Sequence, residues 1–217
     1  MTIPLEIVKQ NFARLLTLKA LRKLLDEFVN LSDDHRADEN RKMLDELVPE
    51  KVPLDLLLTV LRLLLEERVS IRNLPLIMEA IAEARSMYPT SEMICEHVRQ
   101  RLGFQLVAEM KRDDGTIPLI QLAPEWEVAF STYQIKGDNG QIDIALPPDD
   151  FNRLASGVAQ KLAKAAETGV YPAIAAPRHR RRFLRTVLSA KGITNPVLSF
   201  EEIGVEARPS LVGLVAA

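Results

Sequence analysis

Residues 66–79 have the sequence Glu-Glu-Arg-Val-Ser-Ile-Arg-Asn-Leu-Pro-Leu-Ile-Met-Glu. They follow residues 54–65, in which nine of the twelve positions are leucine or valine. Apolar residues on nearly every face of a helix are typical of a segment that is buried on several sides. We therefore expect residues 54–65 to form the central helix of a helical domain, which residues 66–79 connect to the next helix.

Residues 68–73 are predicted to form a tight corner between these two helices. Pro75 is compatible with a helix only in the first turn, so the second helix should begin close to it. Either Ser70 or Asn73 can accept a hydrogen bond from the free backbone amides at that helix start. The two apolar residues of the corner should point inward. The predicted structural site consists of Val69, Ser70, Ile71, Arg72 and Asn73.

Glycine is distributed unevenly along the chain. All nine glycines lie at or after Gly103, and the residues before it are rich in leucine. A chain of 217 residues is long enough for two small domains that each bury a core. We therefore predict a helical domain over residues 1–112 and a second domain, punctuated by glycine and proline, over residues 113–217.

The spacing of apolar residues predicts about five or six helices in the first domain. Their expected ranges are 5–28 with a break near Thr17, 43–48, 54–65, 76–86 and 91–107. The polar and acidic residues 30–40 are predicted to form a loop, with Ser32 or Asp33 capping the helix that follows. Because the connections are short, consecutive helices should pack side by side as an orthogonal or superhelical bundle.

Strand and helix patterns alternate in the second domain. Strands are expected near residues 117–122, 170–176, 196–200 and 210–215, and helices near residues 124–130, 148–168 and 178–191. A local excursion is expected at residues 136–142. The alternation predicts a small α/β sandwich, with helices packed on a mostly parallel or mixed sheet. The expected fold class of the whole chain is therefore α+β, a helical bundle followed by a small α/β sandwich.

The composition narrows the range of functions. A net charge of -2 with 27% charged residues argues against a polyanion-binding surface over the whole chain. No apolar run reaches the ~18 to 20 residues that a membrane helix needs, so we expect this chain itself to be soluble and cytoplasmic. The single cysteine, Cys95, is expected to be a buried thiol in a reducing compartment.

The sequence contains no pattern that is typical of a catalytic or metal site. The three histidines, His35, His97 and His179, lack metal-ligand spacing, and no glycine-rich phosphate loop is present. Carboxylate pairs such as Asp149 and Asp150 are common on solvated surfaces and at helix starts. We therefore predict that the chain is not an enzyme and that it has no catalytic residue, cofactor or metal.

Residues 178–185 form a strongly charged run, Arg-His-Arg-Arg-Arg-Phe-Leu-Arg. A helix advances by about 100° per residue, so Phe183 and Leu184 should face the sheet and the arginines should fan over the exposed side. A solvated or protein-binding face is the favoured interpretation, an acidic partner is the alternative, and a nucleic acid is not expected. The candidate partner-binding residues are Arg178, Arg180, Arg181, Arg182 and Arg185.

Three stretches occur in an order and spacing that extend across nearly the whole chain. They are residues 8–27, residues 60–84 around the corner, and Asn-Pro-Val-Leu-Ser-Phe-Glu-Glu-Ile at residues 195–203. The motif residues of the last stretch are Val197, Leu198, Ser199, Phe200, Glu201, Glu202 and Ile203. Together these stretches resemble the FHIPEP family, the large export-gate proteins of bacterial flagellar and virulence type III secretion systems.

This resemblance implies that the chain corresponds to the last two of four cytosolic subdomains in a protein that also has an N-terminal membrane region. It implies a scaffold in a nonameric ring of neighbouring copies, at the cytoplasmic face of the bacterial inner membrane. It further implies docking of flagellar export substrates, chaperones and other export-apparatus proteins, with the main chaperone cleft in the two other subdomains. The alternatives are the virulence (injectisome) branch, or an unrelated helical adaptor that binds an acidic partner through Arg178–Arg185.

Overall fold

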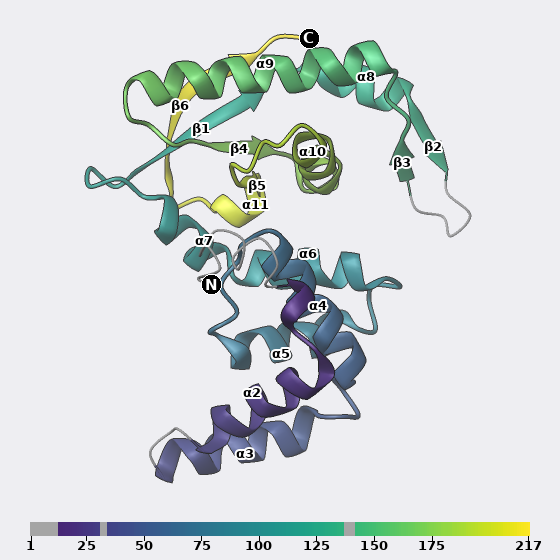
Figure 1. The fold of residues 1–217 in the computed structure, drawn as a ribbon, viewed down its shortest axis with the longest axis vertical. Helices are drawn as coiled ribbons and strands as arrows, with labels where there is room; N and C mark the ends of the chain where they lie inside the picture. Colours follow the sequence, from purple (N-terminus) through teal and green to yellow (C-terminus); the bar gives the residue numbers. More distant parts are fainter. Residues whose placement is uncertain (1–12, 31–33, 137–141) are drawn as a thin grey trace, which may run out of the picture. The chain divides into compact units, whose positions relative to one another are not determined.

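The computed structural model describes residues 13–30, 34–136 and 142–217 of the chain. The chain divides into two compact units between Leu102 and Gly103 (Figure 1). The described part of unit 1 contains helices and their connections, and unit 2 contains a parallel sheet with helices packed on it. This architecture confirms the predicted α+β fold class.

The boundary between the units lies before the predicted one. Helix α7 (Gly103–Met110) packs against the short helix α11 (Phe200–Ile203), which belongs to unit 2. Gly103 permits this close approach, because a Cβ atom at that position would lie 2.5 Å from the carbonyl oxygen of Glu202. The helix predicted over residues 91–107 is therefore interrupted at the boundary.

Unit 1 is built from α2 (Leu18–Asn30), α3 (Asp34–Leu47), α4 (Leu54–Glu66), α5 (Leu74–Ala84) and α6 (Ser91–Arg101). The break predicted near Thr17 is present, and the Thr17 hydroxyl accepts a hydrogen bond from the amide of Ala20 at 3.1 Å. The predicted start of the first helix lies in residues 1–12, outside the described residues.

The loop predicted over residues 30–40 is wrong, because α3 begins at Asp34. The segment is polar, but arginine, lysine, glutamate and alanine are good helix formers. The Asn40 side chain also donates a hydrogen bond to the Phe28 carbonyl at 2.9 Å, which ties α3 to α2. The predicted capping residues, Ser32 and Asp33, lie outside the described residues.

The core of unit 1 is formed by α4, α5 and α6. Helix α4 buries Leu57, Val60, Leu61 and Leu64 completely, and its other leucines are half-buried. Both α4 and α5 pack against α6, where Cys95 is buried as predicted. Helix α4 also contacts α2, so it lies between two neighbouring elements. Helix α4 thus occupies the central position that its leucine-rich sequence predicts.

The sheet of unit 2 has four parallel strands in the order β5-β4-β1-β6. The strands are β1 (Thr116–Leu122), β4 (Ala173–Ala176), β5 (Val197–Ser199) and β6 (Arg208–Val215). A separate antiparallel hairpin consists of β2 (Gln134–Lys136) and β3 (Ile142–Ile144). The excursion predicted at residues 136–142 lies mostly outside the described residues.

Helices α8 (Glu125–Thr132), α9 (Pro148–Glu167) and α10 (Arg178–Ala190) contribute to one core with the sheet. Ile120, Ile174 and Val197 occupy paired positions on neighbouring strands, so their side chains share one face. These residues belong to the same buried cluster as Leu154 of α9 and Leu184 of α10. Helices α9 and α10 therefore cover the same face of the sheet, as expected for two right-handed crossovers that step in the same direction, from β1 to β4 and from β4 to β5.

Candidate functional site

The corner after α4 is held by backbone hydrogen bonds. The amide of Arg68 donates to the carbonyl of Leu65 at 3.0 Å, and the amide of Val69 donates to that of Leu64 at 2.9 Å. Arg68 has a φ of 60°, the left-handed conformation that commonly ends a helix. Val69 is buried, at 3% exposure, as predicted. The chain thus turns sharply within one residue and places an apolar anchor directly after the turn.

Of the two predicted capping residues, Asn73 caps α5. Its side-chain oxygen accepts a hydrogen bond from the amide of Leu76 at 3.5 Å, and Pro75 occupies the first turn of the helix. Among the other corner residues, Ser70 and Ile71 are half-buried and Arg72 is exposed. The structure therefore brings the corner residues together as a bend with a capped helix start.

An ion pair that the sequence did not reveal joins the start of the corner to α6. The Arg99 side chain of α6 is 3% exposed and lies 3.3 Å from a carboxylate oxygen of Glu67, the residue directly after α4. Removing one partner of a buried ion pair typically costs about 3–5 kcal/mol. Nothing local in the sequence distinguishes Arg99 from surface arginines, because its partner lies on another helix.

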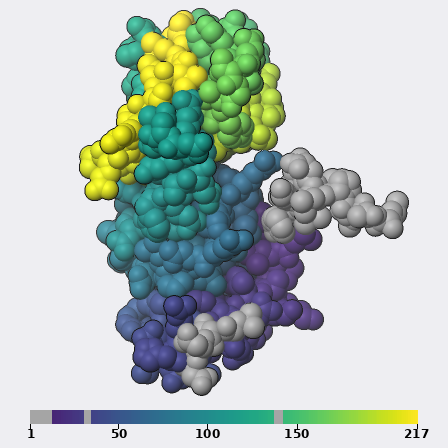
Figure 2. Space-filling view, turned by 90° about the vertical axis from the view of Figure 1, so that its left-hand side faces the viewer, coloured from purple at the N-terminus to yellow at the C-terminus, as the bar shows by residue number. Residues whose placement is uncertain are grey.

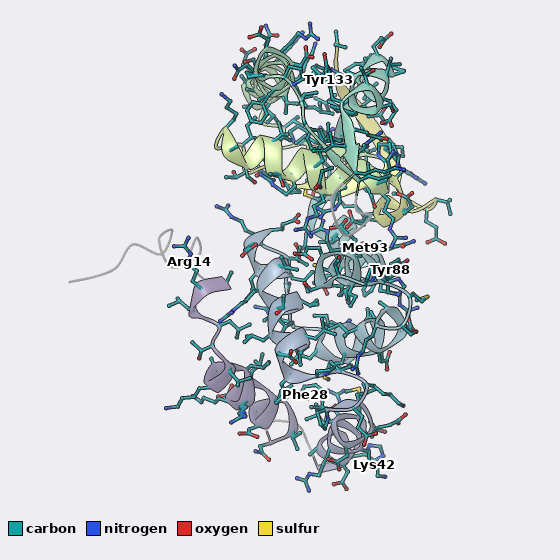
Figure 3. The ribbon with its side chains drawn as sticks, turned by 90° about the vertical axis from the view of Figure 1, so that its right-hand side faces the viewer. Arg14, Phe28, Lys42, Tyr88, Met93 and Tyr133 are labelled. Carbon is teal, nitrogen blue, oxygen red and sulfur yellow. The ribbon has the colours of Figure 1, made fainter. Side chains whose placement is uncertain are left out.

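Helices α5 and α6 are joined by a second group of polar side chains. Glu83 lies 3.2 Å from the Nε2 atom of His97 and 3.6 Å from a guanidinium nitrogen of Arg101. Tyr88, labelled in Figure 3, lies in the connection between the two helices, with its ring 5.9 Å from that of His97. His97 therefore takes part in helix packing.

The motif at residues 197–203 forms β5, an outer strand of the sheet, and the short helix α11 that follows it. Ser199 ends β5 and caps α11 through a reciprocal pair of hydrogen bonds with Glu202, at 3.1 and 2.7 Å. Within the motif, Val197, Leu198, Ser199, Glu202 and Ile203 are buried, and Phe200 and Glu201 are exposed. Most of this motif therefore holds the fold together, and two of its side chains reach the surface.

The prediction of an exposed arginine face on α10 is wrong for two central arginines. Arg180 is 3% exposed and donates hydrogen bonds to Glu127 of α8 at 3.0 and 2.6 Å and to the Ser131 hydroxyl at 3.3 Å. The hydrogen bond from Arg180 lowers the pKa of Glu127, and His179 adds to this effect. Arg180 thus joins α10 to α8.

Arg181 and Arg185 bind backbone carbonyls of unit 2 (Figure 1 shows α10 beside β4 and β5). Arg181 is 0% exposed and donates to the carbonyl of Val197 at 3.3 Å. Arg185 donates to the carbonyls of Asn195, at 2.7 Å, and of Ile193. The remaining candidates, Arg178 and Arg182, are half-buried. Helical periodicity could not predict these contacts, because a long side chain on the flank of a helix can reach past its apolar face.

Within the described residues, no group of three histidine, cysteine, aspartate or glutamate side chains could hold a metal ion. None of the described helices is long and apolar enough to cross a membrane. The chemistry of the described site residues is that of helix caps, ion pairs and hydrogen bonds between elements. The absence of enzyme activity and of a cofactor remains a prediction.

A model of the FHIPEP family matches residues 1–208. The chain belongs to the FHIPEP family. Its relatives in this family include the flagellar biosynthesis protein FlhA of Caulobacter vibrioides, which is 35% identical over 211 residues. That match covers 97% of this chain and 29% of FlhA, so this FHIPEP chain spans less than a third of the relative's length.

Two solved structures share the fold of this FHIPEP chain. One is the complex of the Chlamydia pneumoniae proteins CdsV and CdsO, with a TM-score of 0.79 and 21% identity over 97% of this chain and 59% of that one. The other is the nonameric EscV cytosolic domain from the type III secretion system, with a TM-score of 0.74 and 21% identity over 94% of this chain and 57% of that one. Family membership and fold thus agree with the resemblance that the three sequence stretches carry.

Proposed function

We propose that this chain is a scaffold and docking part of a flagellar type III export gate and that it has no catalytic role. The observation that carries the proposal is the 35% identity with FlhA over 97% of the chain. The structure supports a scaffold, because the predicted site residues that lie within the described residues mainly cap helices and join elements. In this proposal the chain requires neither a cofactor nor a metal.

Ring assembly is the first part of this proposal. EscV, which shares the fold, is described as a nonameric cytosolic domain. In the proposed role, the corner at residues 68–73 fixes the angle between α4 and α5, and so sets how unit 1 presents its outer surface to a neighbouring copy. The ring would lie at the cytoplasmic face of the inner membrane, attached through parts of the protein outside these residues.

Docking is the second part of the proposal. CdsV, which also shares the fold, was solved in complex with another protein, CdsO. We infer that the present chain likewise contributes surfaces for export substrates, chaperones or other export-apparatus proteins. Exposed apolar side chains of unit 2, including Val128, Phe104 and Phe200, provide surface of the kind that protein partners bury.

The two alternatives are less well supported. The virulence branch shares the fold, and the secretion-system protein SsaV of Salmonella typhimurium is 24% identical, as is the FlhA of Bacillus subtilis. The flagellar assignment therefore rests on the 35% identity with the FlhA of Caulobacter vibrioides. An independent adaptor that binds an acidic partner through Arg178–Arg185 would need exposed cations. Arg180 and Arg181 are buried and hydrogen-bonded within unit 2, so this alternative loses its central residues.

A chimeric protein tests the flagellar assignment directly. The matching 211 residues of Caulobacter vibrioides FlhA would be replaced by this chain, and flagellar assembly would be measured in a strain without its own FlhA. We expect the chimera to restore flagella, and a control chimera with the matching EscV segment to fail. A chimera that accumulates normally but restores nothing, or equal restoration by the EscV control, would contradict the assignment.

A further inference from the structure

Strand β6 leaves one side of the sheet open. It is the last strand in the order β5-β4-β1-β6, and no strand of the described residues pairs with its outer side. The carbonyl of Val215 accepts a hydrogen bond from the amide of Ala123, at 2.9 Å, so it points toward the β1 side. Backbone groups alternate in direction along a strand, so the N–H and C=O of Leu214 point to the open side.

The open edge is apolar and unprotected by charge. Leu211 is 59% exposed, Val212 is 36% exposed and Leu214 is 47% exposed. Edge strands in soluble proteins are usually protected by lysine, by proline or by a bulge that twists them away. β6 has Pro209 and a register irregularity, but residues 210–215 contain no charged residue and no proline. The edge therefore retains the features that allow another strand to pair with it.

A groove runs between α9 and the end of β6, with a volume of about 610 Å³. Figure 2 shows β6, in yellow, at the surface beside α9, in green. Gly157 of α9 lets the two elements approach closely, since a Cβ atom at this position would lie 2.7 Å from a methyl carbon of Val215. The groove thus continues the apolar edge of β6.

The wall of this groove on α9 is basic. Arg153 and Lys161 both line it, and the alkyl part of Lys161 lies over Gly213 of β6. Arg153 is also paired with Asp150 at 2.7 Å. If two copies of the chain paired through β6, an antiparallel arrangement would bring the two basic walls together and their like charges would repel. An extended segment that carries acidic side chains fits this charge better than a second copy does.

We propose that β6 is a docking strand for an extended, acidic and apolar segment of a partner protein. The segment adds to the sheet as a fifth strand, with its backbone bonded to β6 and its apolar side chains on Leu211 and Leu214. Its acidic side chains lie toward Arg153 and Lys161. The inference specifies one partner class of the proposed docking function and rests on that function only for the source of the segment.

A tryptophan beside the groove provides an intrinsic fluorescent probe of peptide binding. Trp126 is the single tryptophan, its indole N–H donates to the carbonyl of Ala216 at 3.0 Å, and the guanidinium of Arg153 lies 5.4 Å from the ring centre. Both Ala216 and Arg153 line the groove. A segment bound there should change the fluorescence of Trp126.

The test is a titration of the 217-residue chain with the synthetic peptide Glu-Val-Thr-Val-Glu-Val-Thr. We expect saturable binding by tryptophan fluorescence, together with slower hydrogen exchange of the Leu214 amide. A peptide with lysine in place of glutamate should bind about tenfold more weakly. A peptide with the same side chains but N-methylated at every backbone amide cannot donate the hydrogen bonds of a strand and should not bind.

Substitutions in the chain test whether the peptide binds at β6. Leu214→Gln should weaken binding of the acidic peptide by about tenfold, because it replaces apolar contact by a neutral polar group. Lys161→Glu should reduce the preference for the acidic peptide over the lysine peptide. Met87→Gln, which makes the same kind of change at an exposed apolar residue of unit 1, is the matched control and should leave binding unchanged.

Three outcomes would overturn the proposal: no saturable binding at millimolar peptide, equal binding of the N-methylated peptide, or self-association of the chain that Leu214→Gln abolishes. The last outcome would identify a second copy as the occupant. These results are separable from the proposed gate function. The chimera can restore flagella without peptide binding, and the peptide can bind although the chimera fails.

Discussion

The corner of unit 1 and helix α10 of unit 2 both carry arginines, but they use them in different ways. At the corner, Arg72 is exposed, and the bend is held by backbone hydrogen bonds and by the Asn73 cap. In α10, Arg180 and Arg181 are buried and hold neighbouring elements with their guanidinium groups. The bend itself therefore depends on backbone geometry, supported by the Glu67–Arg99 ion pair, and α10 depends on its own buried arginines. The sequence predicted the corner as a bend and wrongly placed these arginines of α10 on an exposed face.

The largest expected effect is at Arg181. Arg181→Ala should lower the free energy of unfolding of unit 2 by about 3–5 kcal/mol, because it leaves a cavity in place of a large buried side chain and removes the hydrogen bond to the Val197 carbonyl. Arg72→Ala, at the exposed corner position, should change stability by less than about 0.5 kcal/mol. Urea unfolding followed by tryptophan fluorescence for unit 2 and by circular dichroism for both units measures the two effects. Similar losses in the two variants would abolish the distinction between the regions.

A medium effect is expected at Asn73. Asn73→Ala should destabilise unit 1 by about 1 kcal/mol, because it leaves the amide of Leu76 without its side-chain acceptor. Asn73→Ser keeps an acceptor and should recover most of the loss, which separates capping from other roles of the side chain. Circular dichroism during urea unfolding gives the comparison. If the alanine and serine variants were equally unstable, the cap would not be the source of the effect.

The smallest effect is the pH dependence of the stability that Glu127 contributes through its contacts with Arg180 and His179. The pKa of Glu127 is lowered in the folded chain, so its contribution to stability is present above its unfolded pKa, about 4.5. This contribution should disappear as the pH falls below about 5 and through the lowered folded value. Urea unfolding at pH 6 and pH 4 should show a smaller difference for Glu127→Gln than for the original chain. Glu125→Gln, an exposed change on the same helix, should leave the difference intact.

Local signals account for what the sequence predicted well. Pro75 and Asn73 mark a helix start through backbone chemistry alone, and the leucines of residues 54–65 mark a buried helix by their number. Both features depend on neighbours within a few residues. The strands β1 and β4 were recognisable for the same reason, because their apolar runs are short and bounded by turn residues.

Long-range contacts account for what the sequence did not reveal. Arg180 bonds to Glu127, which is 53 residues away, and Arg181 bonds to Val197, which is 16 residues away. Gly103 separates α6 from α7 because it packs on α11, nearly a hundred residues later along the chain. Helical periodicity gives the direction of a side chain but not the partner that its end will reach, so these contacts follow only from the fold.

The measurement that tests the central claim most directly is ring assembly and flagellar export by the FlhA chimera with Ile71→Asp. Ile71 is half-buried in the corner, so an aspartate there should disturb the angle between α4 and α5 without removing the core of unit 1. We predict that the unchanged chimera forms rings and exports flagellar subunits, and that the Ile71→Asp chimera does neither efficiently at a normal cellular level. Normal rings and normal export with a stable Ile71→Asp variant would contradict the account.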